Sequence, residues 1–304
     1  MDITKAFIKA KQPCADGFRW YVRNAHEDSS YQELLDALVA AGRVQDACWL
    51  LTQFGPTDAT LDLDELGADD LVFAGTVRVR RGIDITGTLR TGRGLHAEGG
   101  IRVGGSLHAG ADVHSGGAVT IGEDLMTAGA LQAAWSVSVQ GNLHCETLRA
   151  GWEVHCEGDA RMDGHARIGG ELRTGGALRC SKQLQVGAGL DCGATLQAGQ
   201  GVEAEGDVRA AMHLLAGWGI RARGDIAAGG AIRVGESLWA DGYILAGDGY
   251  GVYAGMDVRV DAWESSASVR ARRRPEGLRS GWWAGAPPGC QEEEDACAGD
   301  SHAA

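Results

Sequence analysis

The sequence of 304 residues lacks the features that would identify a membrane-spanning protein or a common type of enzyme. It has no run of twenty apolar residues, which a membrane-spanning helix needs, and no apolar core near its start of the kind found in signal peptides. It also lacks a serine nucleophile elbow, a zinc-protease helix, a Walker loop and a dinucleotide fingerprint. We therefore expect a cytoplasmic, non-enzymatic protein with no transmembrane segment and no cofactor.

Paired cysteines and excess positive charge are absent as well. None of the eight cysteines forms a Cys-x-x-Cys pair, so neither a zinc site nor a disulfide framework is indicated, and the cytoplasm is the default compartment. The net charge of −13 argues against nonspecific binding to nucleic acid or to anionic membranes. These absences favour a protein partner, or a second copy of the chain, as the binding partner.

What the sequence does contain is a six-residue repeat. An aliphatic residue recurs at every sixth position from Val77 to Leu143, takes one five-residue step to Leu148, and then recurs nearly to Val260, usually with glycine in the turn that follows. The first and third residues of each repeat point to one side of a short strand, and the middle residue points to the other. Such a unit cannot bury its own apolar face and is stable only when stacked on its neighbours. The repeat predicts a parallel β-solenoid.

The repeat also sets the domain organisation. Three repeats per coil, as in hexapeptide β-helices, give about ten coils for the thirty-one repeats. We predict an all-β fold with a helical cap over residues 1–60, the solenoid over 61–261, and a mostly disordered tail over 262–304. Cys145, Cys156, Cys180 and Cys192 occupy inward third positions and are expected to be small buried residues.

Two helices are predicted in the cap. Ser30 and Glu33 form a capping box at the start of one helix, and the other runs from Val44 to Phe54 and stops at Gly55. The cap is expected to cover the first coil, because an open solenoid end exposes apolar core and unpaired strand edge. The alternative is a recognition surface made by the aromatic residues of this region, which are Trp20, Tyr21 and Trp49.

The end of the chain breaks the repeat. Two extra residues before Val252 predict a small glycine-rich loop that carries Tyr250. After residue 261 come a cluster of arginines, Trp282 and Trp283, and the acidic run 292–295. This composition is typical of a disordered tail, with the two tryptophans folding back over the last coil as an alternative.

The outward middle positions supply the candidate charged sites. Four arginines follow one another at these positions, namely Arg161, Arg167, Arg173 and Arg179. They indicate either a solvated face or a surface for an acidic partner. His96 and His114 should lie roughly 5 Å apart in adjacent coils, but no third ligand shares their column, so no metal site is predicted.

Tryptophans supply the candidate partner-binding site. Trp135 and Trp152 should occupy equivalent corners of successive coils, and Trp218 and Trp239 lie further along the chain. An indole at a corner cannot enter an interior built for leucine and alanine, so these rings should be at least partly exposed. Exposed paired aromatic residues are typical of binding surfaces, although the rings could instead pack against each other or under the tail.

Three resemblances extend these expectations. The repeats from Val77 to Val260 resemble the bactofilins, bacterial β-helix proteins that polymerise end to end, and this likeness implies a self-assembling scaffold. They also look like the repeats of hexapeptide acyltransferases, but no extruded catalytic loop interrupts them before residue 247. The stretches FIKAKQPCADGFRWYVRN and GRVQDACWLL are similar to helical leaders of bacterial accessory and toxin-immunity proteins. We expect a capped solenoid that binds and tethers or neutralises a partner, with the bactofilin-like scaffold and the acyltransferase-like enzyme as alternatives.

Overall fold

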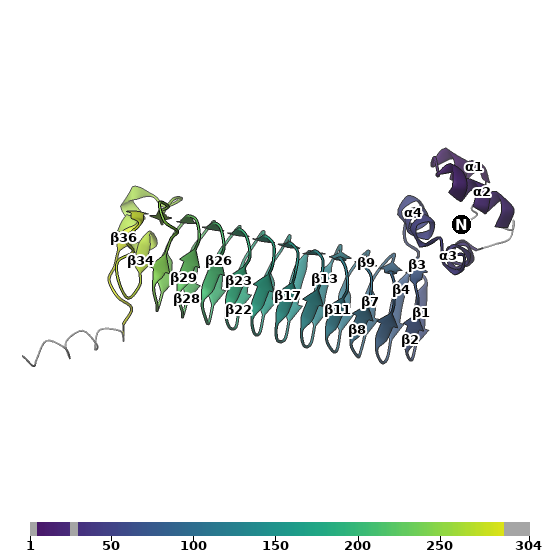
Figure 1. Cartoon of the computed structure of the whole chain (residues 1–304), viewed down its shortest axis with the longest axis horizontal. Helices are drawn as coiled ribbons and strands as arrows, with labels where there is room; N and C mark the ends of the chain where they lie inside the picture. The colour runs from purple at the N-terminus through teal and green to yellow at the C-terminus, as the bar shows by residue number, and fades with distance from the viewer. Residues whose placement is uncertain (1–4, 25–29, 289–304) are drawn as a thin grey trace, which may run out of the picture. The chain divides into compact units, whose positions relative to one another are not determined.

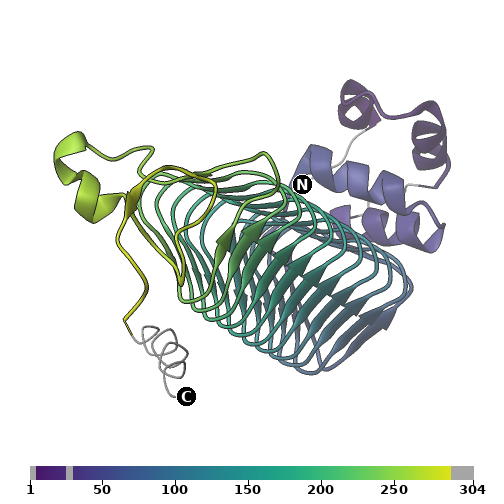
Figure 2. The same cartoon turned by 60° about the vertical axis from the view of Figure 1, so that its left-hand side comes forward.

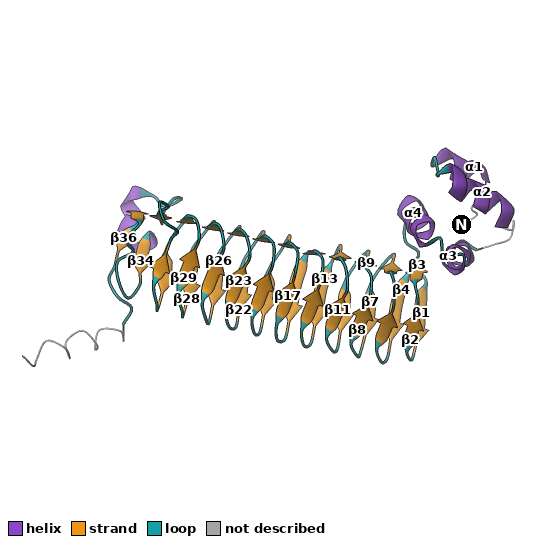
Figure 3. Ribbon diagram, viewed as in Figure 1, coloured by secondary structure: helices purple, strands orange, loops and turns teal. Residues whose placement is uncertain are grey.

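The computed structural model describes residues 5–24 and 30–288 and confirms the predicted fold class. Four helices precede a parallel β-solenoid of about twelve turns with 18-residue coils (Figures 1 and 3). By its internal contacts the chain forms two compact units, residues 1–134 with 139–141, and residues 135–138 with 142–304. No helix in the described ranges combines the length and the apolar character needed to cross a membrane.

The first unit begins with the helices α1 (Lys5–Ala10), α2 (Ala15–Asn24), α3 (Tyr31–Ala40) and α4 (Val44–Phe54). The predicted capping box is present, because the Ser30 hydroxyl accepts the Glu33 amide and the Glu33 carboxylate accepts the Ser30 amide at 2.8 Å. Leucines of α3 form the centre of the helical core. Tyr21 is buried there and Trp20 and Trp49 pack against it half-buried, which favours a packing role for these aromatic residues.

Helices α3 and α4 pack on strand β3 (Leu71–Phe73) of the first coil. The Gln32 side-chain amide donates to the Val72 carbonyl and accepts from the Ala74 amide, each at 2.9 Å. Val72 and Ala74 are fully buried members of the helical core. One glutamine thus satisfies backbone groups of β3 that have no preceding coil to pair with, so the helical region covers this edge of the solenoid.

The strands of the first unit form three parallel sheets, and each coil contributes one strand to each sheet. Sheet A contains β1 (Thr60–Leu63), β4 (Thr76–Val79), β7 (Leu95–Ala97), β10 (Val113–Ser115) and β13 (Ala130–Ala133). Sheet B contains β2 (Leu66–Ala68), β5 (Ile83–Ile85), β8 (Ile101–Val103) and β11 (Val119–Ile121). Sheet C contains β3, β6 (Leu89–Thr91), β9 (Leu107–Ala109) and β12 (Leu125–Thr127).

The second unit repeats this arrangement, and Figure 2 shows its coils stacked strand over strand. Sheet A contains β16 (Thr147–Ala150), β19 (Ala166–Ile168), β22 (Leu184–Val186), β25 (Val202–Ala204), β28 (Ile220–Ala222), β31 (Leu238–Ala240), β34 (Ser268–Arg270) and β36 (Trp282–Trp283). Sheet B contains β14 (Val137–Val139), β17 (Val154–Cys156), β20 (Leu172–Thr174), β23 (Leu190–Cys192), β26 (Val208–Ala210), β29 (Ile226–Ala228) and β32 (Ile244–Leu245). Sheet C contains β15 (Leu143–Cys145), β18 (Ala160–Met162), β21 (Leu178–Cys180), β24 (Leu196–Ala198), β27 (Leu214–Ala216), β30 (Ile232–Val234), β33 (Val252–Tyr253) and β35 (Leu278–Ser280).

The structure differs from the prediction at residues 262–288, where a mostly disordered tail was expected. After η1 (Val260–Ala262) and α5 (Trp263–Ser266), three further strands join sheets A and C. Val269 pairs with Leu238 on one side and with Trp283 on the other, so the second tryptophan does fold back over the last coils. These strands lack the hexad spacing, and the strands β1 to β3 precede the counted repeats, which is why repeat counting predicted about ten coils instead of about twelve. Residues 289–304, with the acidic run, lie outside the described residues.

The interior of the solenoid has polar atoms at some inward third positions, and several of these side chains donate to a backbone carbonyl. The Ser115 hydroxyl donates to the Gly99 carbonyl at 3.0 Å, and the Cys180 thiol donates to the Gly164 carbonyl at 3.2 Å. The four cysteines predicted to be buried are buried. Burial raises the pKa of the Cys145 thiol to about 12 and also raises the pKa of Cys180. Cys180 and Cys192 thus resemble the buried serine, because each thiol donates to a turn carbonyl.

The turns between strands are held by glycine and by aspartate. A Cβ atom on Gly104 would lie 2.1 Å from the Thr86 carbonyl oxygen of the preceding coil, so only glycine allows this stacking distance. Asp112 accepts the Ala130 amide at 2.7 Å, and Asp159 accepts the Ala177 amide at 2.7 Å, each one coil further on. Some of the acidic residues in the turns therefore bind the backbone of the next coil.

Candidate binding surfaces

Trp135 and Trp152 lie at the corner between sheets A and B in successive coils, as predicted. The Trp152 amide donates to the Trp135 carbonyl at 3.0 Å, which places the two residues next to each other in successive coils. Their relative exposures are 67% and 64%. Within residues 5–24 and 30–288, neither indole stacks on another ring or on a guanidinium. The expectation that these rings are exposed is therefore met, and packing under the described part of the tail is not observed.

Small residues continue this corner after the tryptophan pair. The Gly170 amide donates to the Trp152 carbonyl at 2.7 Å, and Ala188 and Gly206 follow in the next two coils. No large side chain from these positions covers the indole of Trp152. The two tryptophans are thus followed at this corner by small residues, so a partner can approach the indoles closely.

Trp218 and Trp239 do not join this pair. Trp218 lies at the corner between sheets C and A, where its amide donates to the Gln200 carbonyl, and it is 51% exposed. Trp239 lies in the middle of β31 instead of at a corner, and its indole N–H donates to Asp241 Oδ1 at 3.0 Å. The guanidinium carbons of Arg221 and Arg270 lie 5.1 Å and 5.0 Å from its ring centroid. The four tryptophans form three separate sites.

The four successive arginines are likewise dispersed, because consecutive hexads belong to different faces of a three-sided coil. Arg161 and Arg179 are neighbours on sheet C, whereas Arg167 lies on sheet A and Arg173 on sheet B. Arg161 pairs with Asp163 at 2.9 Å, and Arg173 pairs with Glu171 at 2.9 Å. No single face therefore presents all four charges to an acidic partner.

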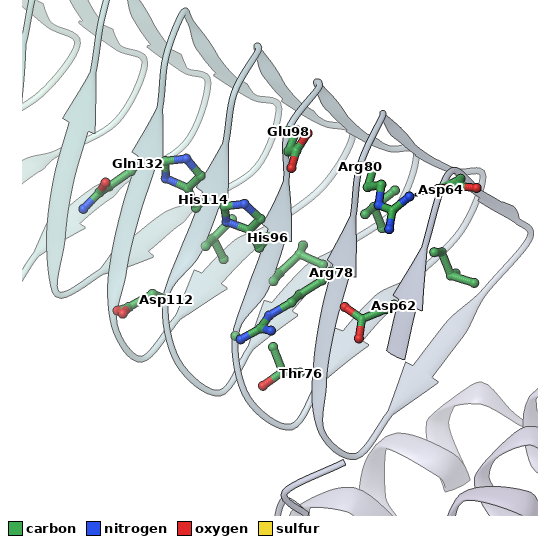
Figure 4. A pocket seen from close by; sticks show the side chains of 15 residues that line it. Asp62, Asp64, Thr76, Arg78, Arg80, His96, Glu98, Asp112, His114 and Gln132 are labelled. Atoms are coloured by element: carbon green, nitrogen blue, oxygen red, sulfur yellow. Dashed lines mark hydrogen bonds and ion pairs between the residues drawn. The ribbon is translucent and has the colours of Figure 1, made fainter. Parts of the chain in front are cut away.

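A polar groove runs across sheet A of the first unit (Figure 4). His96 and His114 stack there with ring centroids 4.7 Å apart and planes 7° from parallel, which confirms their predicted spacing. Arg78 and Gln132 occupy the flanking positions of the same row, and Glu98 and Asp112 line the groove from adjoining turns. Among the described residues, no group of three His, Cys, Asp or Glu side chains is placed to hold a metal ion.

Two further titratable groups have shifted pKa values on these surfaces. Hydrogen bonds from His144 and Arg161 lower the pKa of the Asp163 carboxyl. Burial lowers the pKa of His108, and the nearby Arg90 adds to that effect. Neither group lies in a cavity with a nucleophile, so both are explained by their neighbours on the strand surface.

One family model matches part of this chain. Residues 1–54 are similar to the YdhT N-terminal domain, and the match covers the four helices and ends where α4 ends. No curated protein and no solved structure matches the chain. The similarity thus lies in the helical region, and the match stops before the first solenoid strand.

Proposed function

We propose that this chain binds another protein through the Trp135–Trp152 pair and tethers or neutralises that partner, without catalysing a reaction itself. The observation that supports this proposal is the exposure of two adjacent indoles on a surface otherwise made of small and polar residues. Tryptophan is the residue most enriched in the energetic centres of protein interfaces. A partner would therefore gain the most binding free energy by covering the aromatic pair.

The size of that gain follows from the exposed area. Because a tryptophan buries roughly 150–250 Å² when covered, burying the exposed two-thirds of one indole would contribute about 3 kcal/mol to a complex. Two such rings offset a large part of the entropy lost on association. The exposed Glu153 follows Trp152 directly and would belong to the polar rim of the interface.

Coverage of the solenoid ends favours this binder over the bactofilin-like scaffold. Helix α3 packs on β3 at the start of the solenoid, and β36 pairs with β34 near its end. End-to-end polymerisation needs open strand edges, and these contacts reduce the available edge. The acyltransferase-like alternative has less support, because the described strands are joined by short turns as far as residue 245, and longer connections come only after it, at residues 246–251 and 254–267.

The binding proposal is tested with the double variant Trp135→Ala/Trp152→Ala against Trp218→Ala, which removes an isolated indole that is half exposed. Proteins captured by each variant from bacterial extract are quantified by mass spectrometry, and the purified candidate is then titrated by calorimetry. We expect the double variant to lose at least about 30-fold in affinity and Trp218→Ala to retain wild-type affinity. Equal binding by all three proteins would reject the pair as the interface.

The scaffold alternative is tested by the mass of the assembled protein. Light scattering and electron microscopy at several protein and salt concentrations distinguish a small discrete species from filaments. We expect a concentration-independent mass for the intact chain. Filaments would show that the ends are not closed and would replace the binder with a self-assembling scaffold.

A further inference from the structure

The sandwich of Arg221, Trp239 and Arg270 is a second distinctive surface, separate from the tryptophan pair. The three side chains belong to neighbouring strands β28, β31 and β34 of sheet A, in direct register. One guanidinium lies on each face of the indole, at 5.1 Å and 5.0 Å from its centroid. Because the indole N–H is bound to Asp241, the ring is fixed, and both cations are held in place.

Neither cation of the sandwich is neutralised by the part of the chain that the structure describes. Arg223, two residues from Arg221, pairs with Glu205 at 2.8 Å, but neither Arg221 nor Arg270 forms an ion pair within residues 5–24 and 30–288. An aromatic ring attracts a cation without cancelling its charge. The sandwich thus presents two ordered guanidiniums, the donors best suited to carboxylates.

We propose that the acidic run of this same chain, Glu292 to Asp295, binds the two guanidiniums of the sandwich. The guanidiniums flank the ring at 5.1 Å and 5.0 Å, so they lie up to about 10 Å apart. Alternate residues of an extended chain point to the same side and lie about 7 Å apart, so the carboxylates of Glu292 and Glu294 can each extend to one of the two arginines.

The chain length allows this contact. The Ala284 amide donates to the Val269 carbonyl at 3.0 Å, so the chain leaves β36 directly beside Arg270. Seven residues lie between Ala284 and Glu292, and the eight steps from one to the other span up to about 26 Å when extended. The acidic run therefore reaches both cations without any change in the described strands.

Tethering favours this occupant over a free acidic peptide. A short linker gives a local concentration in the millimolar range, so even a contact with a dissociation constant of about 0.1 mM would be mostly formed. Any acidic segment of another protein would have to displace the run. The sandwich is then an acidic-peptide site that the chain keeps occupied, and the proposal does not depend on a role for the Trp135–Trp152 pair.

The test uses the full chain and a fluorescent peptide of residues 288–298 with serine in place of its cysteines. Anisotropy measures peptide binding to the wild type and to a neutral-run variant, Glu292→Gln, Glu293→Gln, Glu294→Gln and Asp295→Asn. We expect about tenfold tighter binding to the neutral-run variant, because its sandwich is vacant. Adding Arg221→Gln and Arg270→Gln to that variant should abolish binding.

The matched control is Arg102→Gln with Arg149→Gln in the neutral-run variant, since these exposed strand arginines change the charge equally but flank no ring. This control should bind the peptide as tightly as the neutral-run variant does. Equal peptide affinity for the wild type and the neutral-run variant would overturn the proposal, as would binding that survives loss of Arg221 and Arg270. If the wild type forms a dimer and the neutral-run variant does not, the acidic run binds a second copy of the chain. That result would overturn the intramolecular contact.

Discussion

The two ends of the solenoid are closed by different means. At its start, a separate group of helices supplies an apolar core and the Gln32 amide for strand β3. At its end, the chain adds strands β34, β35 and β36 to existing sheets after an irregular insertion. The start is covered by a helical region that is similar to a known domain family, whereas the end is covered by irregular strands that continue the sheets. The ends should therefore respond independently to mutation.

The largest effect is expected from Leu35→Ala in α3. Leu35 is 0% exposed at the centre of the helical core, so its truncation should lower the free energy of unfolding of the helices by about 2–5 kcal/mol. Because each coil contacts mainly its neighbours, the amides of β34–β36 should keep their protection. Hydrogen exchange by mass spectrometry measures both regions. Equal loss of protection at both would show that the ends unfold as one unit.

A smaller effect is expected from Val269→Ala in β34. Val269 is fully buried between Leu238 and Trp283, and losing its two methyl groups should destabilise the terminal strands by about 2 kcal/mol. Hydrogen exchange should speed up in β34–β36 and remain unchanged in α3 and α4. Unchanged exchange in β36 would mean that the last strand does not depend on this pairing.

The smallest effect is a loss of stability at alkaline pH that is confined to the helical end. Burial raises the pKa of Tyr31 to about 12, and its hydroxyl donates to the Gly55 carbonyl at 3.2 Å. The stabilisation is complete below pH 10, where the unfolded tyrosine ionises, and is lost as the pH rises towards 12. By pH 11 the loss should be about 1.4 kcal/mol, measurable as faster exchange in α3. Tyr31→Phe should lack this pH dependence, and a wild type insensitive to pH 11 would contradict the assignment.

The periodic part of the molecule could be predicted because periodicity is a local property of the sequence. An aliphatic residue every six positions specifies which side chains enter the core, and 18-residue coils then bring His96 beside His114. Counting residues per coil also placed Trp135 and Trp152 in successive coils, once the five-residue step between Leu143 and Leu148 was included. The start of helix α3 could be predicted from its capping box, because this motif is local in sequence and binds the first amides of the helix.

The remaining features depend on contacts that the repeat does not encode. Arg270 reaches Trp239 only because β34 joins sheet A after an insertion, and nothing in its spacing indicates this neighbour. The succession of arginines from Arg161 to Arg179 suggested rows, but three-sided coils separate consecutive hexads. Among the turn aspartates, Asp163 does pair with Arg161, whereas Asp112 and Asp159 each bind a backbone amide of the next coil. In each case tertiary geometry decides the role of the residue.

The aspartates in the turns also constrain how a gene for this protein can change in length. Asp112 and Asp159 each bind the amide eighteen residues ahead, so a duplication or deletion of eighteen codons leaves every such bond with a partner. At the seventeen-residue step, Asn142 instead accepts the Asp159 amide at 3.0 Å. The coil that is one residue shorter is thus held with a side-chain amide as the acceptor. Insertion or deletion of whole coils changes the number of coils without changing the register of any strand, so it is the change in length that this repeat tolerates best.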